Sequence, residues 1–387
     1  MINFFLPTRL IIGEGALDKL SEQKLCGDKA IIVTYGDYVK QLGYLDRTIE
    51  QLKKAGVESV VYDGVTPNPT KEEVHEGAAM AKEFGAKFVV GLGGGSAIDT
   101  AKAVAIMSTN EGDFWDYIPG GTGLGKVFPN DPLPVIAITT TAGTGTEADP
   151  WMVITKTETN EKIGSGNDRT YPYLAIVDPA LMVTVPPRLT AFQGFDALFH
   201  STEGYLNKNS NDLSDIFALK SIELVGKSLV KAVKNGKDMQ ARTDIALANT
   251  LSGINEHAAG TISAHSLAHA MGAFHSNIEH GASLVSTSIA YYTLFAKSGK
   301  CDEKMIKMAK LLGRPDAKTA FDFVDALADL IAACGVDDIK LSEYGFKYEE
   351  LEKYAKNARE TMGGLYFADP FTVTDQDILE VLQKSYK

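Results

Sequence analysis

Histidines and one aspartate recur at helical spacing in the second half of the chain. Four of the seven histidines lie between residues 264 and 281. His265 and His269 are four residues apart, so a helix would place them on one face. His280 follows a break that contains glycine and asparagine, and Asp196 and His200 repeat the spacing of four upstream. We expect two helices to close a metal site between these groups.

The chemistry of these donors indicates the kind of metal site. Carboxylate and imidazole ligands suit Fe²⁺, Zn²⁺, Co²⁺, Ni²⁺ or Mn²⁺. The lack of thiolate ligands argues against a structural zinc, and an open coordination position would suit catalysis. Taken singly, each histidine could be a satisfied core residue, and Asp196 could be a helix cap or an ion-pair partner. The repeated pairing favours the metal site.

A glycine-rich loop is a second candidate site. Residues 91–96 (GLGGGS) follow the apolar run 87–90 and precede a helical pattern at 97–107. Glycines let a backbone approach a phosphate, and the N–H groups and dipole of the following helix attract its charge. The spacing matches neither GxGxxG nor a P-loop, so we expect a pyrophosphate cradle of another type. The alternative is a tight turn without a ligand.

Threonines 139, 140, 141, 144 and 146 form a second loop after an apolar run. Their hydroxyl groups could bind the polar atoms of a nucleotide, or they could bond to their own backbone in a turn. Because both loops follow strands of one predicted sheet, we favour a shared nucleotide.

Short β-branched runs alternate with helical patterns in the first half, which predicts βαβ units and a mostly parallel sheet. The predicted strands are 30–34, 59–62, 87–91 and 134–139, and the predicted helices include 45–55 and 71–84.

Strand-like runs become scarce near Asp178, and Pro186-Pro187 breaks the chain. We therefore predict an α/β dinucleotide-binding domain at 1–185 and an all-helical metal-binding domain at 186–387. The helical patterns lie at 213–233, 239–251, 305–312, 317–334 and 348–358.

Composition excludes several classes of protein. The net charge of −12 gives no electrostatic footprint for nucleic acid or an anionic membrane. The three cysteines are too few for a disulfide framework and suit a reducing compartment. No secretory signal or long apolar run is evident, so we expect a cytoplasmic protein.

Several segments resemble the iron-containing, metal-dependent (group III) alcohol dehydrogenases. The resemblance covers nearly the whole chain, in order, and implies an α/β dinucleotide-binding domain followed by a helical metal domain. The segments that carry it are GGGSAIDTAK, TTTAGTGTE, AIVDPALM, PPRLTAFQGFDALFHSTEGY and HxxxH…HG.

The resemblance implies reversible hydride transfer between an alcohol and a nicotinamide cofactor, with Fe²⁺ as the expected metal and Zn²⁺ as the alternative. It also implies a homo-oligomer, a dimer or larger. The implied metal ligands are Asp196, His200, His265 and His280. His269 matches a histidine beside the metal, and we expect it to relay a proton because imidazole titrates near neutrality.

The cofactor is expected to lie on the two loops, and Asp99 and Lys102 are predicted as catalytic residues that orient cofactor or substrate. The carboxylate of Asp37, after the first strand, could bind ribose hydroxyls and repel a 2′-phosphate, so we expect NAD, with NADP as the alternative. The predicted cofactor residues are Asp37, Gly93, Gly94, Gly95, Ser96, Asp99, Thr139, Thr140, Thr144 and Lys162.

Substrate choice is where the chain departs from the family. Many members have an apolar phenylalanine followed by Ser-Asn where this chain has Glu256-His257-Ala258. A polar wall with one large aromatic residue suggests a small, polar primary alcohol or aldehyde. Alternatively, Glu256 and His257 pair with each other or face solvent. The predicted pocket residues are Trp151, Glu256, His257, Thr261 and His275.

Other functions are compatible with parts of this pattern. A glycerol or polyol dehydrogenase, or a dehydroquinate-synthase-like lyase, could use the same fold. A metal-binding protein without turnover is a different class. Since a sensor need not retain both an intact ligand set and a glycine loop, an enzyme is favoured.

Overall fold

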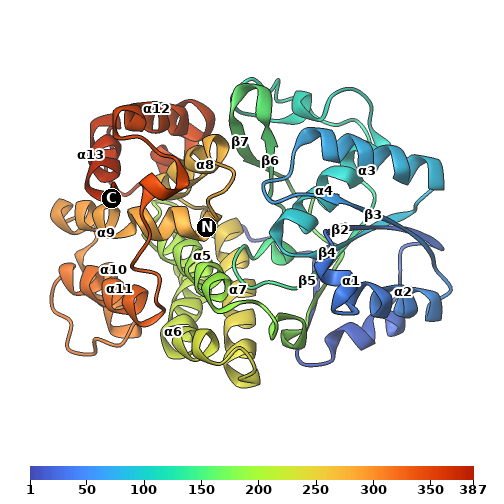
Figure 1. Cartoon of the computed structure of the whole chain (residues 1–387), viewed down its shortest axis with the longest axis horizontal. Helices are drawn as coiled ribbons and strands as arrows, with labels where there is room; N and C mark the ends of the chain where they lie inside the picture. Colours follow the sequence, from blue (N-terminus) through green and yellow to red (C-terminus); the bar gives the residue numbers. More distant parts are fainter. The chain divides into compact units, whose positions relative to one another are not determined.

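The computed structural model describes residues 1–387, and the chain divides into two compact units (Figure 1). The α/β unit comprises Phe4–Thr141 and Gly145–Val183, and the helical unit comprises Met1–Asn3, Ala142–Thr144 and Thr184–Lys387. The boundary predicted at 185/186 lies close to Val183. The sequence did not indicate that the short segment Ala142–Thr144 would group with the helices.

The α/β unit is built on a six-stranded parallel sheet with the order β1-β8-β5-β4-β2-β3. An antiparallel hairpin of β6 and β7 is separate from it. The strands are β1 (Arg9–Ile12), β2 (Lys29–Tyr35), β3 (Glu58–Val65), β4 (Phe88–Gly93), β5 (Val135–Thr139), β6 (Met152–Lys156), β7 (Glu161–Ser165) and β8 (Leu174–Val177). The helices are α1 (Tyr38–Gln41), α2 (Tyr44–Lys54), α3 (Lys71–Phe84) and α4 (Gly95–Thr109).

Both faces of this sheet are buried, which explains why its strands have continuous apolar runs. Ile31 and Val33 share a core cluster with residues of α3 and α4. Ala30 and Ile32 pack in another cluster with residues of α2. Alternate residues of one strand therefore point to opposite faces of the sheet. Helices α3 and α4 cover one face, and α1 and α2 cover the other (Figure 1).

The four predicted strands are present, but the sequence interpretation missed β1, β6, β7 and β8. β1 and β8 have only four residues each, so they carry little periodic signal. β8 pairs with β5 at the register Thr139↔Val177 and thereby completes the sheet. The β6–β7 hairpin is joined by a short helical turn at Thr157–Thr159 rather than by a glycine turn.

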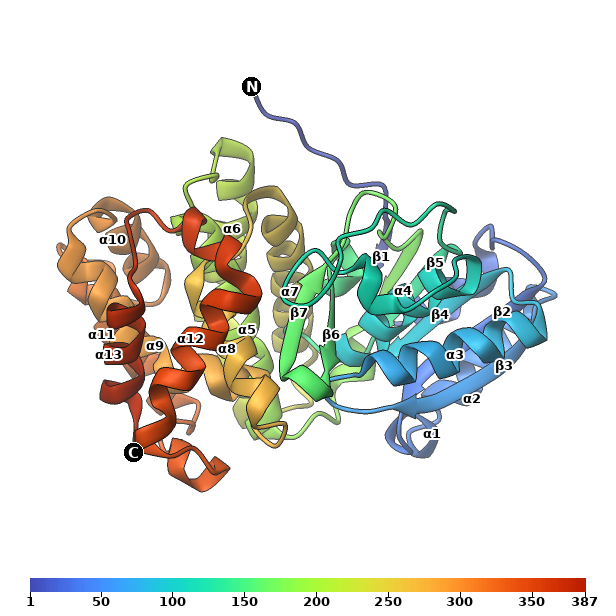
Figure 2. The same cartoon turned by 90° about the horizontal axis from the view of Figure 1, so that it is seen from above.

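The helical unit consists of nine α-helices (Figure 2). None of them combines the length and the hydropathy that a membrane span requires. Their bounds are α5 (Pro187–Leu206), α6 (Asp212–Lys234), α7 (Met239–Ala259), α8 (Ser263–Phe274), α9 (His280–Ser298), α10 (Asp302–Leu311), α11 (Phe321–Ala333), α12 (Leu351–Met362) and α13 (Asp375–Ser385).

Helix α5 is the central element of this unit. It contacts α6, α7 and α9, and nearly every residue from Thr190 to Leu206 is buried. A helix buried on all sides should be apolar all round. The polar residues that α5 carries, among them Asp196, His200 and Glu203, therefore need a specific explanation.

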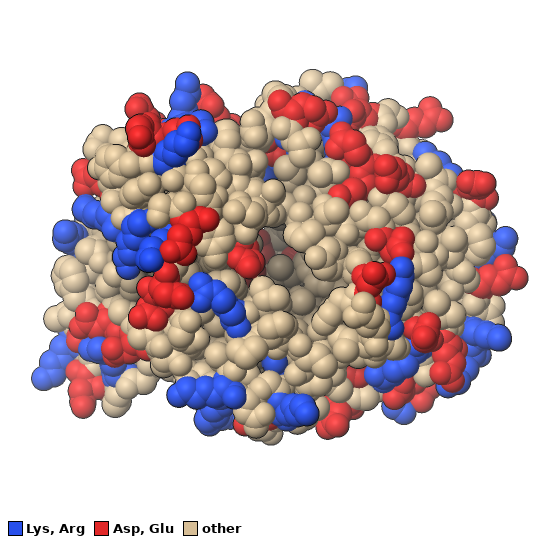
Figure 3. Space-filling view, viewed as in Figure 1, with Lys and Arg blue, Asp and Glu red and all other residues tan.

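Charged side chains are distributed over both units. On the face shown in Figure 3, lysine and arginine are scattered among aspartate and glutamate, without an extended basic surface. This face offers no footprint for a polyanion, in keeping with the net charge of −12.

Candidate active site

Three polar residues lie along one face of α5. Asp196, His200 and Glu203 are spaced four and three residues apart, so successive turns stack them. All three are buried. Because a buried ionisable group is costly unless it is paired or binds a metal, this face is a candidate ligand surface.

Helices α8 and α9 bring two histidines to Asp196. Asp196 Oδ1 lies 3.6 Å from His265 Nε2 and 3.5 Å from His280 Nε2. His280 is the first residue of α9, after the expected break. One ligand atom from each of these residues lies within 4.8 Å of the others, which is close enough for one cation to bind all three.

His200 lies beside the same oxygen. Its Nδ1 is 3.7 Å from Asp196 Oδ1, and its ring centroid is 4.3 Å from that of His265. Burial and the neighbouring His265 lower the pKa of His200 to about 4, so the imidazole is in its neutral, metal-binding form at neutral pH. Asp196, His265 and His280 are therefore the three residues placed to bind one cation, and His200 lies beside them.

The donors in this cluster fit a divalent cation. Asp196 Oδ1, His200 Nδ1 and His265 Nε2 are buried and make no hydrogen bond. Unsatisfied buried polar atoms are rare in folded proteins because each costs desolvation energy. A cation bound to a carboxylate and imidazoles would satisfy all three atoms at once.

Glu203 is a functional residue that the sequence interpretation missed. Its Oε1 lies 2.6 Å from His265 Nδ1, and its Oε2 accepts a hydrogen bond of 2.9 Å from Ile262 N. Burial alone would lower the pKa of His265, but Glu203 and Asp196 raise it to about 10. The signal was available, because Glu203 lies on the same helical face as Asp196 and His200.

Glu256, predicted to line the substrate pocket, lies at the metal cluster. Its Oε2 is 3.4 Å from His200 Nε2, and its side chain is 18% exposed. The predicted helix 239–251 was too short, since α7 continues to Ala259 and carries both Glu256 and His257.

His269 lies next to the cluster and does not belong to the three-residue group. Its ring centroid is 5.2 Å from that of His280, and it is buried. Its Nδ1 is 2.8 Å from the thioether sulfur of Met362. Because a thioether only accepts hydrogen bonds, this contact favours a proton on Nδ1 and a lone pair on Nε2.

The remaining pocket candidates have different surroundings. Thr261 is buried in the loop between α7 and α8, where its carbonyl oxygen accepts a hydrogen bond from Asn207. His275 stacks on Phe346 with centroids 3.9 Å apart, and its Nε2 lies 2.7 Å from Tyr354 Oη. His275 therefore packs in an aromatic cluster, and its place in the substrate pocket stays a prediction. Trp151 belongs to the α/β unit and is half-buried.

The glycine loop joins the end of β4 to the start of α4. Gly94 is the N-cap of α4, and no side chain caps the helix. The first N–H groups of such a helix have no partner inside it and favour an anion. A Cβ on Gly94 would lie 2.9 Å from the side chain of Thr141. Thr140 N donates to Gly93 O at 2.9 Å, so the glycine and threonine segments adjoin as predicted.

The surroundings of Lys102 correct its predicted role. The ammonium is fully buried. It donates to the carbonyl oxygen and Oγ1 of Thr146, to the carbonyl oxygen and Oδ1 of Asp149, and to the carbonyl oxygen of Trp151. With its three N–H donors directed at these oxygens, Lys102 fixes the turn at residues 146–151 rather than binding cofactor or substrate.

Asp99 serves the same turn. Its carboxylate accepts hydrogen bonds from Thr146 Oγ1 at 2.7 Å and from Val153 N at 2.9 Å. Burial raises the pKa of Asp99 despite these bonds and the charge of Lys102. The predicted catalytic role of Asp99 therefore also gives way to one of positioning.

The other predicted cofactor residues are placed as follows. Asp37 is the second residue after β2; its side chain is 77% exposed, and its Oδ1 lies 3.6 Å from Lys40 Nζ. Lys162 Nζ donates to Asn68 Oδ1 at 2.6 Å. Thr139 Oγ1 donates to Thr141 O at 2.9 Å. Thr144 is part of the helical unit.

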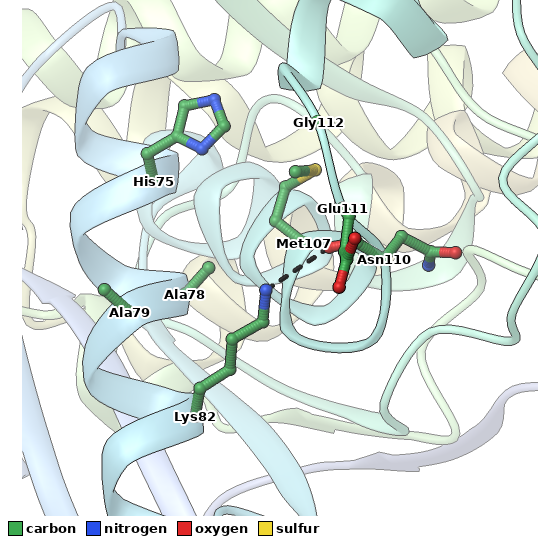
Figure 4. Close-up of a pocket in the computed structure, with 8 residues that line it drawn as sticks. All are labelled: His75, Ala78, Ala79, Lys82, Met107, Asn110, Glu111 and Gly112. Atoms are coloured by element: carbon green, nitrogen blue, oxygen red, sulfur yellow. Dashed lines mark hydrogen bonds between the residues drawn. The ribbon is translucent and has the colours of Figure 1, made fainter.

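A separate cavity of about 310 Å³ lies on the α/β unit between α3 and the end of α4 (Figure 4). Lys82 Nζ crosses it to donate to Asn110 O at 3.3 Å. Its single histidine, His75, accepts a hydrogen bond from Phe114 N. Because both groups are engaged and no cluster of metal ligands is present, we assign this cavity no catalytic role.

The two units define a class of protein. An α/β unit with an anion-binding loop at its strand ends is typical of dinucleotide binding. A buried carboxylate–imidazole cluster is typical of a catalytic divalent metal. Enzymes that need both are metal-dependent dehydrogenases, in which the cofactor accepts hydride and the metal acts on the substrate oxygen.

Comparison with known proteins identifies the family. Residues 7–179 match the model of the iron-containing alcohol dehydrogenases, and residues 190–386 match the model of the family's C-terminal region. The chain therefore belongs to the iron-containing alcohol dehydrogenase family. It is an oxidoreductase that acts on CH–OH groups with a nicotinamide cofactor.

Individual relatives agree with this assignment over the full chain. The chain is 32% identical to the NAD-dependent methanol dehydrogenase of Bacillus methanolicus over 393 residues, which cover 100% of both proteins. It is 32% identical to the 1,3-propanediol dehydrogenase of Klebsiella pneumoniae, covering 100% of this chain and 99% of the relative. The structure matches an archaeal halo-thermophilic alcohol dehydrogenase from a Red Sea brine pool with a TM-score of 0.94 and 36% identity, covering 100% and 99% of the two chains.

Proposed function

We propose that the chain interconverts a small, polar primary alcohol and its aldehyde with NAD and a divalent metal held by Asp196, His200, His265 and His280. The observation that carries this proposal is the cluster of Asp196, His265 and His280, whose ligand atoms lie within 4.8 Å of one another. Fe²⁺ is the proposed metal, with Zn²⁺ as the alternative, because both accept mixed carboxylate and imidazole ligands.

The ligand residues determine what the metal can contribute. A divalent cation at this site supplies a Lewis acid that stabilises negative charge on the substrate oxygen. One carboxylate and three neutral imidazoles leave such a site with net positive charge, which preserves that acidity. Asp196 is buried, so its charge acts in a medium of low dielectric constant.

We assign the glycine loop and the threonine segment to the cofactor. The uncapped start of α4, at Gly94–Ser96, would hold the pyrophosphate, and Thr139 and Thr140 adjoin it at the ends of the strands. Asp37 would accept hydrogen bonds from the adenosine ribose. The positive charge of Lys40 beside Asp37 reduces the repulsion that Asp37 would exert on a 2′-phosphate. Initial rates with NADH and NADPH are therefore the direct test of cofactor choice. A strong preference for NADPH would contradict the proposal.

His269 is the proposed proton relay. The contact with Met362 leaves Nε2 as the atom that can take the proton of an alcohol or return it. We expect His269→Ala to lower kcat by roughly a hundredfold or more, the usual size of general acid–base catalysis, and to change the pH profile of kcat. His75→Ala, in the α/β unit, is the matched control. Unchanged turnover and pH profile in His269→Ala would remove His269 from the mechanism.

Polar side chains near the end of α7 and in the following loop support a polar substrate. Glu256 and His257 end α7, and Thr261 follows in the next loop. The Klebsiella relative is named for a diol, which fits the same chemistry. The test is a panel of butanal, glycolaldehyde, lactaldehyde and a carboxylated or sulfonated short aldehyde, assayed under anaerobic metal loading. A clear preference in kcat/KM for butanal would refute the polar substrate.

Assembly and location remain part of the same proposal. We propose a homo-oligomer, to be measured by light scattering coupled to size-exclusion chromatography. All three cysteines are free, and Cys301 and Cys334 are buried, which suits a reducing compartment such as the cytoplasm.

A further inference from the structure

We propose that Glu256 is a positioning carboxylate that orients His200 toward the metal and strengthens metal binding. This role rests on the proposed metal site and goes beyond it, because it gives a metal-directed function to a residue outside the ligand set. It also explains why a carboxylate is found where an apolar residue would be sufficient to line a pocket.

Two of the three histidines around Asp196, His265 and His200, have matching surroundings. His265 has Nε2 at 3.6 Å from Asp196 Oδ1 and Nδ1 at 2.6 Å from Glu203 Oε1. His200 has Nδ1 at 3.7 Å from Asp196 Oδ1 and Nε2 at 3.4 Å from Glu256 Oε2. Each imidazole thus has one nitrogen toward the shared aspartate oxygen and the other toward a glutamate.

This arrangement has a chemical consequence. A neutral imidazole carries hydrogen on one nitrogen and a lone pair on the other. A carboxylate that accepts the N–H fixes the tautomer, so the lone pair faces the opposite direction, toward the cation. Carboxylates in this position also make the ring more basic, and their loss typically weakens metal binding roughly tenfold to hundredfold.

The fold holds Glu256 in this place. Its neighbour Asn255 donates from Nδ2 to His200 O at 3.0 Å, which fixes α7 against α5 at the level of His200. Gly204 makes this approach possible, because a Cβ there would overlap the Asn255 side chain. Glu256 is also mostly buried, so solvent screens its interaction with His200 only weakly.

The test is a titration of metal-free protein with Co²⁺, monitored by its visible absorption and by competition with a chelator. We expect Glu256→Leu to weaken Co²⁺ binding roughly tenfold to hundredfold, and Glu256→Gln to weaken it less, because the amide oxygen can still accept the N–H. Glu203→Gln should weaken Co²⁺ binding as Glu256→Gln does, because it is the equivalent change beside His265. Glu223→Gln, an exposed glutamate on α6, should bind Co²⁺ like the wild type.

The outcomes separate the possible roles of Glu256. Weaker binding with an unchanged shape and intensity of the Co²⁺ bands supports a positioning role. Bands altered in intensity would make Glu256 a direct ligand and overturn the proposal. If both Glu256 variants bind Co²⁺ with wild-type affinity but prefer a different aldehyde, the proposal is also overturned, and Glu256 is instead a residue that contacts the substrate. A wild type that binds no Co²⁺ would refute the metal site itself, which is a different failure.

Discussion

Buried charged side chains form two sets in this protein: the proposed metal site in the helical unit and a structural clamp around Lys102 in the α/β unit. In the helical unit, Glu203 stabilises a charged or metal-bound His265 at 2.6 Å. In the α/β unit, the buried ammonium of Lys102 pairs with Asp149 and partly offsets the charge of Asp99. Both sets lie in or beside segments that resemble the family motifs, but only the contacts of each side chain show whether it belongs to the proposed metal site or supports the fold.

Replacing Lys102 tests its structural role. Lys102→Met leaves two buried carboxylates without a counter-charge and several buried oxygens without a donor. We expect a loss of about 3–5 kcal/mol in the free energy of unfolding, the usual cost of breaking a buried pair. Lys54→Met, at an exposed ion pair, should change it by less than about 0.5 kcal/mol. Equal stabilities in urea unfolding would contradict the clamp.

The same clamp predicts a pH dependence of stability. Burial, together with the nearby Asp99, outweighs Lys102 and raises the pKa of Asp149 from 3.8 to about 7. The folded protein therefore keeps a proton that the unfolded chain releases between these values. Stability conferred by this group is fully present at low pH, so the free energy of unfolding should fall as the pH rises from about 4 to about 7.

The variant Asp149→Asn isolates this contribution. It should have a shallower fall in the free energy of unfolding over this pH window than the wild type. Asp168→Asn, an exposed substitution in the same unit, should keep the wild-type slope. Identical slopes for all three proteins would show that Asp149 does not titrate in the window.

At the scale of the elements, close packing decides where the functional groups lie. α4 can begin directly after β4 because Gly94 leaves room for the Thr141 side chain. α7 can approach α5 because Gly204 leaves room for Asn255. Both contacts depend on a glycine, one at the start of α4 and one near the end of α5. Sequence periodicity does not indicate which side chain packs against such a residue.

The glycine loop yields a prediction about cofactor binding. In Gly94→Ala the new Cβ would lie 2.9 Å from Thr141, so the loop must shift and its first N–H groups would be displaced. We expect NADH affinity to fall at least about tenfold by calorimetric titration, since several bonds to one pyrophosphate depend on this geometry. Gly364→Ala has no atom within 4 Å of the new Cβ and is the control. Wild-type NADH affinity in Gly94→Ala would separate the loop from the cofactor.

At the scale of the whole molecule, all proposed metal ligands belong to the helical unit, and the glycine loop belongs to the α/β unit. A ligand that binds only the folded state stabilises the part of the molecule that binds it. Metal and cofactor should therefore have separate stabilising effects on the two units.

Removing the metal tests this division. Chelation should raise amide hydrogen exchange in α5, α8 and α9. A free metal concentration of about a thousand times Kd adds about 4 kcal/mol to the stability of the folded state, and chelation removes this contribution. Exchange in β2 and β4 should stay the same. Mass spectrometry of the chelated and reloaded protein measures both regions. Equal protection of α5 before and after chelation would contradict the proposed ligand set.

The sequence alone determined much of this protein, because spacing is a local property. Strands β2 to β5 and helices α2 to α4 were predictable from periodicity. Helical spacing and family motifs predicted Asp196, His200, His265 and His280 as ligands, and the structure brings these side chains together. Short strands such as β1 and β8 were not, since four residues carry too little pattern.

Tertiary structure alone decided which groups meet. Glu203 and Glu256 come from different helices, and only the packing of α7 and α8 against α5 brings each carboxylate to its histidine. It also showed that the five oxygen acceptors around Lys102 occupy its ammonium, and that His275 packs against Phe346. Side-chain pairing depends on the distances between elements, and these distances arise from burial and close packing over the whole unit.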